Sequence, residues 1–464
     1  MNTWHTLRAA VAGMALALAL PAFSQWENAG LPGGNHNVKM MYTDSLHDWL
    51  LVAVQGQPMT INDSAYLPML RDNGLAWDTL GLFGHYVRTA VVYHDTLFVG
   101  GVFDYVRNST ASNIAYYANG AWHPYGTFTN QVDHGLVQRL RVVDDTLYAV
   151  GQFEYADGQF CQGLAKRVGA HWEPVQGWPD LALYADPWLM DIIRYQGKLV
   201  VSGNFISQDL TLKDMLQYNG TAWVPVCNGC LMGGQDGVAT MVEYQEYLYV
   251  GGIFFYATGN AGQGIMRWNG QQWSSLRPPG EGLQNINYSD QYSPDIGDLK
   301  VSDGLLYIGG IFKFVDHQPT PAGICTWDGW AYCLFEGEPF SDSFGPFDFY
   351  QGSLYGATLG TSQNMKGLVR YTGELCTFSG VEDEIATAQV LRTVWSASGE
   401  LTLLGLSDGP HTVKVYDAHG RVVLERSVTS AARRSEGIRF TGQSSALYLV
   451  VVDGQRTGRL VPIR

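Results

Sequence analysis

The sequence predicts an all-β protein, a β-propeller of seven four-stranded blades, and three features carry this prediction. A short apolar strand with paired glycines, as in residues 247–254, recurs along most of the chain. A hairpin with an Asn-Gly turn and a tryptophan, as in residues 265–276, follows most copies of that strand. Both features repeat about every 50 residues, which is the length of a four-stranded propeller blade.

The repeats follow one another in a fixed order. The strand with paired glycines has an early copy near Leu50 or Leu51 and later copies that begin at Leu97, Leu147, Leu199, Leu248, Leu306 and Leu354. The hairpin tryptophan recurs as Trp77, Trp122, Trp172, Trp223 and Trp273. A further apolar stretch precedes the glycine strand, in residues 89–93, 140–143, 191–195 and 299–301. The last copy is degenerate, so six or eight blades stay open beside seven.

A β-sandwich and a solenoid are the alternatives for a repeat of this length. Parallel β-helices usually repeat at shorter periods, and a sandwich does not reproduce one strand motif so often. A propeller must also close its ring, and Trp26 stands one period before Trp77. We therefore expect the strand at Trp26 to complete the blade that contains Leu354 and Tyr371.

The repeat resembles the propellers of the kelch and galactose-oxidase central-domain family. It is more similar to the "LYVGGxF … WNGxxW" repeat proteins that bacteria of the Bacteroidetes type export. The resemblance covers residues 26–376 and implies a propeller domain over residues 25–378. It implies a fold and no particular chemistry.

Residues 1–24 have the pattern of a secretory signal peptide. Arg8 provides the positive charge, residues 9–20 are apolar, and small residues precede an expected cleavage site before Gln25. A membrane anchor is the alternative, but this apolar run is shorter than the roughly 20 residues that span a bilayer. No later segment is apolar enough to span, so we expect a secreted protein or one attached to the outer-membrane surface.

The repeat pattern stops after Cys376. Residues 379–394 are predicted to be a linker, and residues 395–464 a small immunoglobulin-like β-sandwich with short strands separated by Asp-Gly and His-Gly turns.

This C-terminal region resembles the type A sorting domain of the type IX (Por) secretion system. The resemblance rests on residues 413–421, 446–452 and 459–464. Ala446 stands where that family has glycine, and no Asn-Pro precedes Trp395. The resemblance implies export across the outer membrane, with the secretion machinery as a partner. An accessory immunoglobulin-like module is the alternative.

The six cysteines of an exported chain suggest disulfide bonds. Cys325 and Cys333 flank a turn that would place them opposite one another if its loop held three residues. Cys227 and Cys230 could close a small loop. Cys161 and Cys376 are expected to be free and buried, with a long-range bridge as the alternative.

The links between predicted strands differ in length at the two ends of each blade. Links such as residues 144–145 and 269–270 are tight, whereas links such as residues 103–113 and 277–298 are long. We expect function on the face with the long loops, around the central channel.

The loops of this face carry aromatic residues beside carboxylates, a combination that can bind sugar rings. The candidate ligand-binding residues are Trp178, Tyr184, Trp188, Tyr288, Asp290, Tyr292 and Asp316. Packing of these aromatics between blades is the alternative.

Composition limits the classes of function. The formal net charge is -15, and no Lys/Arg cluster is visible, which argues against nucleic-acid and anionic-membrane binding. The histidines and cysteines match no catalytic or metal-binding motif, so we predict no catalytic residue, no metal and no cofactor.

The sequence therefore predicts a secreted or cell-surface binding or adhesion protein without catalytic chemistry, whose extracellular ligand is a glycan or a protein. The alternatives are an extracellular hydrolase or lyase acting on a polysaccharide, and a purely structural surface protein. Clustered carboxylates with raised pKa values in the central channel would favour the enzyme.

Overall fold

The computed structural model describes most of the chain outside its first 24 residues. The described residues are 25–32, 37–55, 59–61, 64–130, 135–181, 187–207, 211–226, 237–256, 259–285, 294–337, 339–358, 365, 367–373, 377–378, 392–395, 400–404, 409–416, 421–431, 434–435, 438–439, 448–452 and 455–460. Their regular elements are all β-strands. The chain divides into two compact units, Met1–Gly380 and Val381–Arg464.

The described part of the first unit contains seven antiparallel sheets of four or five strands, one for each sequence repeat. Within a sheet, consecutive strands are neighbours. In chain order the sheets contain β2 (Asn37–Asp44), β3 (Trp49–Gln55), β5 (Ser64–Asp72), β6 (Trp77–Phe83) and the short β4 (Met59–Ile61); β7 (Val87–Tyr93), β8 (Thr96–Gly101), β9 (Ile114–Ala118) and β10 (Ala121–Pro124); β12 (Leu136–Val143), β13 (Thr146–Gln152), β16 (Leu164–Val168) and β17 (His171–Pro174); β18 (Trp188–Tyr195), β19 (Lys198–Ile206), β20 (Lys213–Tyr218) and β21 (Trp223–Pro225); β22 (Val238–Tyr244), β23 (Tyr247–Gly252), β24 (Ile265–Trp268) and β25 (Trp273–Ser274); β27 (Asp295–Ser302), β28 (Leu305–Ile311), β31 (Ile324–Trp327), β32 (Tyr332–Leu334) and β36 (Thr377–Phe378); and β33 (Phe347–Tyr350), β34 (Ser353–Thr358), β35 (Gly367–Tyr371) and β1 (Trp26–Asn28).

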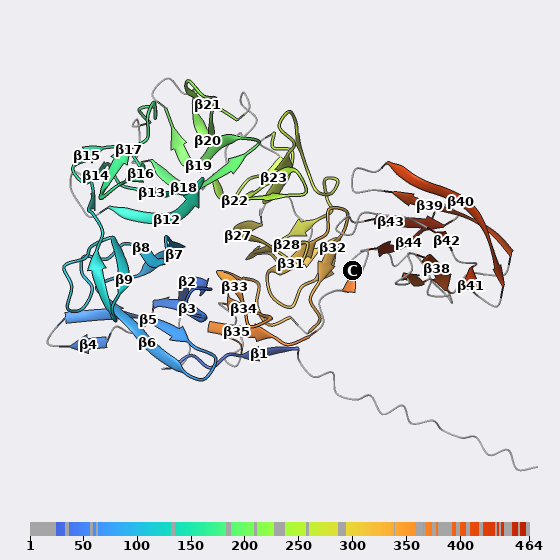
Figure 1. The fold of residues 1–464 in the computed structure, drawn as a ribbon, viewed down its shortest axis with the longest axis horizontal. Helices are drawn as coiled ribbons and strands as arrows, with labels where there is room; N and C mark the ends of the chain where they lie inside the picture. Colours follow the sequence, from blue (N-terminus) through green and yellow to red (C-terminus); the bar gives the residue numbers. More distant parts are fainter. Residues whose placement is uncertain are drawn as a thin grey trace, which may run out of the picture. The chain divides into compact units, whose positions relative to one another are not determined.

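The first strands of these sheets form a ring. β2 contacts β7, β7 contacts β12, and the series continues through β18, β22 and β27. A hydrogen bond from the Phe347 amide to Asp298 joins β27 to β33, and β33 contacts β2. Figure 1 shows these strands facing a common centre, with the later strands of each sheet farther out. This arrangement is an all-β, β-propeller-like fold, as the repeat predicts.

The ring closes by pairing the start of the unit with its last sheet. β1 pairs antiparallel with β35, and Trp26 lies opposite Tyr371. The Trp26 indole is only 1% exposed and packs against Tyr371 and Phe344, with ring centroids 4.8 and 5.4 Å away. The predicted closure by the Trp26 strand is therefore confirmed.

The links between strands also follow the prediction. Two-residue turns such as residues 94–95 and 303–304 join first to second strands, and the turns between third and fourth strands, such as residues 119–120, lie at the same end of the sheets. We call this end the turn face. The opposite end, the long-loop face, carries the links from second to third strands and most links between sheets. Two three-stranded sheets lie within these longer links: β11 (Phe128–Thr129) with β14 (Tyr155–Ala156) and β15 (Gln159–Phe160), and β26 (Leu283–Gln284) with β29 (Phe314–Val315) and β30 (Gln318–Pro319).

The periodic tryptophans fasten each sheet to the preceding one. Trp122 donates its indole N–H to the carbonyl of Leu80, at 3.0 Å. Trp172 does the same to the carbonyl of Tyr125, at 2.8 Å. Because these indoles are buried and their N–H groups must find acceptors, the period of the tryptophans reflects contacts between sheets.

A second type of contact between neighbouring sheets lies on the turn face. Three first strands end in tyrosine followed by glutamine, and each tyrosine hydroxyl donates to a backbone carbonyl in the first turn of the next sheet. These bonds run from Tyr195 to Glu246, from Tyr244 to Gly304 and from Tyr350 to Asp48, at 2.9, 2.8 and 3.0 Å.

A glutamine also contacts one of the Asn-Gly turns of the repeat. Gln196 donates from Nε2 to the Tyr195 hydroxyl and to the carbonyl of Asn269, both at 3.1 Å. Its side chain therefore lies directly over Gly270, where an added Cβ would stand 2.3 Å from Oε1. Gly270 also has a φ of +97°, which L side chains rarely adopt. Glycine at position 270 thus permits both the backbone conformation of the turn and the close approach of Gln196 from the preceding sheet.

The cysteine prediction for the β31–β32 hairpin is wrong. Cys325 is a free, buried thiol, whereas Cys333 is in a disulfide bond. The turn contains four residues, 328–331, because Trp327 pairs with Tyr332. This register places Cys325 opposite Leu334, one position away from Cys333, so the two side chains leave opposite faces of the sheet. Cys161 is free and buried, as expected. Cys227, Cys230 and Cys376 lie outside the described residues.

The described strands of the second unit form one antiparallel sheet. Its order is β37 (Arg392–Trp395), β38 (Glu400–Leu404), β41 (Arg434–Ser435), β40 (Val422–Ala431), β39 (Gly409–Tyr416), β43 (Tyr448–Val452) and β44 (Gln455–Leu460), with β42 (Ile438–Arg439) also paired to β38. The two end strands, β37 and β44, contact each other, so the sheet curls back on itself. Val413 and Val415 are fully buried, which identifies the apolar face of β39.

Candidate functional site

Four of the seven predicted ligand-binding residues lie outside the described residues, namely Tyr184, Tyr288, Asp290 and Tyr292. The other three, Trp178, Trp188 and Asp316, come from separate links and strands.

Asp316 is used within the fold. Its carboxylate is 7% exposed and accepts two hydrogen bonds from Arg277, from Nε at 3.1 Å and from Nη2 at 2.9 Å. Its other oxygen accepts the amide of Gly282, at 2.8 Å. Asp316 thereby ties the β29–β30 turn to the link before β26, and this geometry gives it a structural role.

The two predicted tryptophans lie near the long-loop face. Trp178 is half-buried, packs edge to face on Trp223 with centroids 4.8 Å apart, and donates its N–H to the Gln162 carbonyl. This is the packing between sheets that the alternative interpretation expects. Trp188 opens β18, and its buried Nε1 has no hydrogen-bond partner among the described residues.

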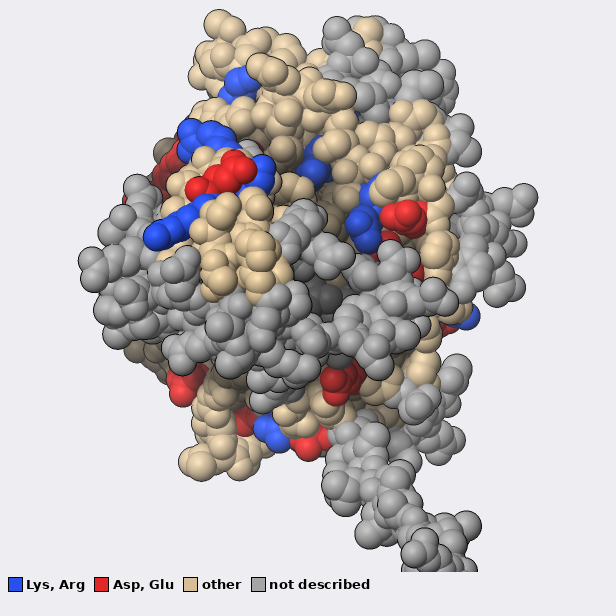
Figure 2. Space-filling model, turned by 90° about the vertical axis from the view of Figure 1, so that its right-hand side faces the viewer, with Lys and Arg blue, Asp and Glu red and all other residues tan. Residues whose placement is uncertain are grey.

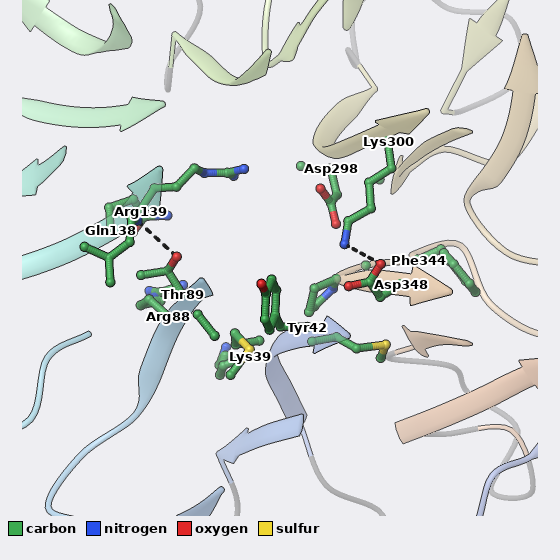
Figure 3. Close-up of a pocket in the computed structure, with 18 of the residues that line it drawn as sticks. Lys39, Tyr42, Arg88, Thr89, Gln138, Arg139, Asp298, Lys300, Phe344 and Asp348 are labelled. Carbon is green, nitrogen blue, oxygen red and sulfur yellow. Dashed lines mark hydrogen bonds and ion pairs between the residues drawn. The ribbon is translucent and has the colours of Figure 1, made fainter. Parts of the chain in front are cut away.

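A cavity opens between the first strands of the sheets, in the central channel. Its volume is about 640 Å³, within the range of small-molecule sites. Its walls come from β2, β7, β12, β27, β28 and the segment leading into β33. Figure 3 shows side chains from these different sheets around one open space. The labelled charged residues in this view are Lys39, Arg88, Arg139, Asp298, Lys300 and Asp348.

A β-bulge occurs at the same place in six of the first strands. Each bulge lies near the long-loop end of its strand and follows an aliphatic residue. The unpaired residues at the bulges are Lys39, Arg88, Gln138, Met190, Ala239 and Gly297. Bulges re-aim side chains and are frequent at barrel rims and beside functional sites. We call these six positions the bulge ring, and they lie at the long-loop end of the channel.

In three of the six strands, the residue after the bulge accepts a hydrogen bond from the next first strand. Thr89 Oγ1 accepts the amide of Leu140, at 3.1 Å, and Asp191 Oδ2 accepts the amide of Met241, at 3.0 Å. Asp298 makes the corresponding bond to Phe347. These contacts satisfy strand amides that have no pairing partner across the channel.

Some channel cations are neutralised within the wall. Arg141 binds the fully buried Asp191 with two hydrogen bonds of 2.9 Å, and Arg139 lies 3.6 Å from the same carboxylate. Burial alone would raise the pKa of Asp191, but Arg139 and Arg141 outweigh it and hold the pKa below its ordinary value. Lys300 is paired with Asp348, at 3.0 Å.

Two other cations of the same channel have no acidic partner among the described residues. Lys39 is half-buried and forms no ion pair there, and the buried Nε of Arg88 has no hydrogen-bond partner there. Burial lowers the pKa of Lys39, and the nearby Arg88 lowers it further. Two like charges therefore stand in a partly desolvated cavity without compensation.

Two neutral polar groups complete this part of the wall. The buried Oε1 of Gln138 has no donor among the described residues. Tyr42 accepts the amide of Val92 at 3.0 Å, which leaves its own hydroxyl proton available to a ligand. Burial raises the pKa of Tyr42, so the hydroxyl stays protonated.

Sequence reasoning missed these residues because it concentrated on the loops. A usable signal existed, since an aliphatic residue and then the bulge residue recur once per repeat, as in Val38-Lys39, Val87-Arg88 and Val137-Gln138. In the view of Figure 2 most of the coloured surface is uncharged, and its blue and red side chains lie close to one another, as in the group at the upper left.

No group of three or more histidine, cysteine or carboxylate residues in the described part of the chain could hold a metal ion. Nor does any helix among those residues have the length and apolarity to cross a lipid bilayer.

No protein-family model and no curated protein matches the sequence. A puromycin-hydrolysing peptidase from Mycobacterium tuberculosis is similar over 80% of this chain and 58% of its own, with 10% identity and a TM-score of 0.44. A Trypanosoma rangeli sialidase in complex with sialic acid is similar over 93% of this chain and 86% of its own, with 10% identity and a TM-score of 0.35. The chain thus spans less than two thirds of the peptidase. Similarities at this level carry no argument about activity.

Proposed function

We propose that this chain is a secreted or cell-surface binding protein without catalytic chemistry, and that its ligand enters the central channel from the long-loop face. The observation that carries the proposal is the cavity of about 640 Å³ at the bulge ring, where Lys39 and Arg88 have no acidic partner among the described residues. Uncompensated charge in a cavity lowers stability, so its presence favours a role in binding.

The finer architecture belongs to the same proposal. We assign the seven sheets to seven blades of a kelch-like propeller, and the second unit to an immunoglobulin-like sorting domain of the type IX (Por) system. The sequence resemblance of residues 413–421 and 446–452 supports the sorting domain. The signal-peptide pattern of residues 1–24 supports export, with the secretion machinery as a transient partner.

The enzyme alternative requires two carboxylates positioned on either side of a glycosidic bond. Asp191 is fully buried and bound to Arg141, so it is not accessible to a substrate, whereas Asp295, Asp298 and Asp348 line the cavity. A purely structural surface protein would have no use for unpaired cations in its channel. The unpaired cations favour binding over a purely structural role, and the mass of each incubated glycan separates binding from hydrolysis.

A glycan array probed with residues 25–464 tests the proposal, followed by mass spectrometry of each incubated glycan. Binding with unchanged glycan mass is the expected result. A cleaved glycan would overturn the non-catalytic assignment. Absence of binding to glycans and to extracellular-matrix proteins would favour the structural alternative.

A further inference from the structure

The bulge ring also indicates the chemistry of the ligand. Lys39, Arg88 and Gln138 occupy equivalent bulges of the three successive strands β2, β7 and β12, so their side chains line one continuous sector of the channel. Figure 3 labels these three side chains and Tyr42 among the residues that line the cavity. We propose that this sector binds a small hydroxylated acid, a carboxylate-bearing monosaccharide or the acidic end of an oligosaccharide. This inference rests on the proposed function.

The charge of the sector selects an anion. The other cations of the wall already have carboxylate partners, Arg141 in Asp191 and Lys300 in Asp348. Lys39 and Arg88 have none among the described residues, and each disfavours the charge of the other. An oxyanion between them would remove this repulsion and form charge-assisted hydrogen bonds, and a guanidinium binds a carboxylate with two parallel bonds.

The size of the charged sector limits the ligand to one or two negative charges. The whole chain has a net charge of -15, so a long polyanion would be repelled by the rest of the molecule. A single acidic group can reach Lys39 and Arg88, which have no carboxylate partner among the described residues, while Asp298 and Asp348 elsewhere in the wall disfavour further negative charge. Nucleic acids and heavily sulfated chains therefore do not fit this channel.

The neutral groups beside the cations select hydroxyls. Gln138 offers a buried carbonyl oxygen that can accept a hydrogen bond, and the Tyr42 hydroxyl can donate one. An inorganic oxyanion without a proton to give would leave the Gln138 oxygen unpaired. A carboxylate on a ring with neighbouring hydroxyls supplies both the negative charge for Lys39 and Arg88 and a donor for Gln138.

Space for the ring lies at the sixth bulge. A Cβ added to Gly297 would meet no atom within 4 Å, and Gly297 lines the same cavity. Its φ does not fall in the left-handed region, so a larger side chain is compatible with the backbone. Met190 occupies the equivalent bulge of β18. Replacing Gly297 with methionine would therefore fill the cavity without altering either cation.

The test measures binding of D-glucuronate, D-glucose and sulfate to residues 25–464 by calorimetry. We expect D-glucuronate to bind at least tenfold more tightly than D-glucose, and more tightly than sulfate, because only the sugar acid offers both charge and hydroxyls. Lys39→Met and Arg88→Gln should each weaken binding about tenfold or more, and Gly297→Met should abolish it. Lys198→Gln removes an exposed charge elsewhere and serves as the control.

A second readout separates a lost site from a misfolded variant. Without ligand, Lys39→Met should raise the melting temperature, because it removes one of two repelling charges. The inference is overturned if D-glucuronate fails to bind the folded wild-type chain, if sulfate binds as tightly, or if Lys39→Met and Arg88→Gln bind like Lys198→Gln. Glycan-array binding that is insensitive to both substitutions would refute this site while the proposed binding function still stands.

Discussion

The six bulged first strands share one backbone feature but fall into two chemical groups. The bulges of β2, β7 and β12 carry Lys39, Arg88 and Gln138, whereas those of β18, β22 and β27 carry Met190, Ala239 and Gly297. The residue after the bulge accepts an amide of the next first strand in both groups, Thr89 in the first and Asp191 and Asp298 in the second. The bulge residues, in contrast, differ in charge and size between the two groups. One position therefore takes part in contacts between sheets, and we propose that its neighbour determines what the channel binds.

The largest expected effect comes from removing a carboxylate that neutralises cations of the channel wall. Asp191→Asn removes the carboxylate that neutralises Arg141 and Arg139, and leaves buried positive charge. Loss of one partner of a buried ion pair usually costs about 3–5 kcal/mol of unfolding free energy. Chemical denaturation at pH 7 measures it.

The effect of Asp191→Asn should also depend on pH. Because the folded pKa of Asp191 lies below its unfolded value of 3.8, its contribution is present above that value and is lost as pH falls further. The difference between wild type and variant should therefore shrink below about pH 4. Asp144→Asn, which breaks the exposed pair with Arg194, is the control and should cost less than about 1 kcal/mol. Equal losses for the two variants would contradict the account.

A smaller effect separates the two kinds of Asn-Gly turn. Gly270 and Gly220 have nearly the same φ, +97° and +100°, but only Gly270 lies under a glutamine of the preceding sheet. Gly270→Ala should cost about 1–2 kcal/mol more than Gly220→Ala, because the alanine methyl displaces Gln196 from its two hydrogen bonds. Thermal unfolding of the two variants measures the difference. Equal destabilisation would mean that the turn conformation alone requires glycine.

The smallest expected effect compares two carboxylates of one sheet. Asp214 in β20 lacks the arginines that surround Asp191, and burial raises its pKa to about 6, although Lys213 opposes the shift. Since the folded pKa exceeds the unfolded one, ionisation destabilises the fold above pH 6, and this penalty disappears as pH falls through 3.8. Asp214→Asn should therefore stabilise the protein by about 1 kcal/mol at pH 8, allowing for the partial exposure of the carboxylate.

The pH profile of Asp214→Asn decides this prediction. Melting temperatures of wild type and variant should converge at pH 4. A stability gain that is constant between pH 4 and pH 8 would show that the change acts through the backbone, where residue 214 has a φ of 58°, and not through charge.

Much of the fold could be predicted from the sequence because the repeat makes one pattern visible many times. The glycine strands, the Asn-Gly hairpins and the periodic tryptophans identify the sheets, and Trp26 indicates how the ring closes. The hairpin register at Cys325 and Cys333 could not be predicted, because one additional turn residue exchanges the faces of a strand.

The site was harder to predict for a physical reason. Carboxylates and aromatics in loops, such as Asp316 and Trp178, look functional in a sequence, but the structure uses both in its own packing. The bulge residues Lys39 and Arg88 look like ordinary polar positions of a strand. Only the pairing registers show that both residues occupy β-bulges, and that these bulges lie at the same level of the channel.

The most direct test of the central claim is the distribution of iodide in crystals of residues 25–464. Anomalous scattering places each bound halide, and an anion collects where positive charge is uncompensated. The account predicts a strong peak between Lys39 and Arg88, and none at Arg141, whose charge Asp191 neutralises. A peak at Arg141, or an empty site at Lys39 and Arg88, would contradict the division of the channel into a binding sector and a structural one.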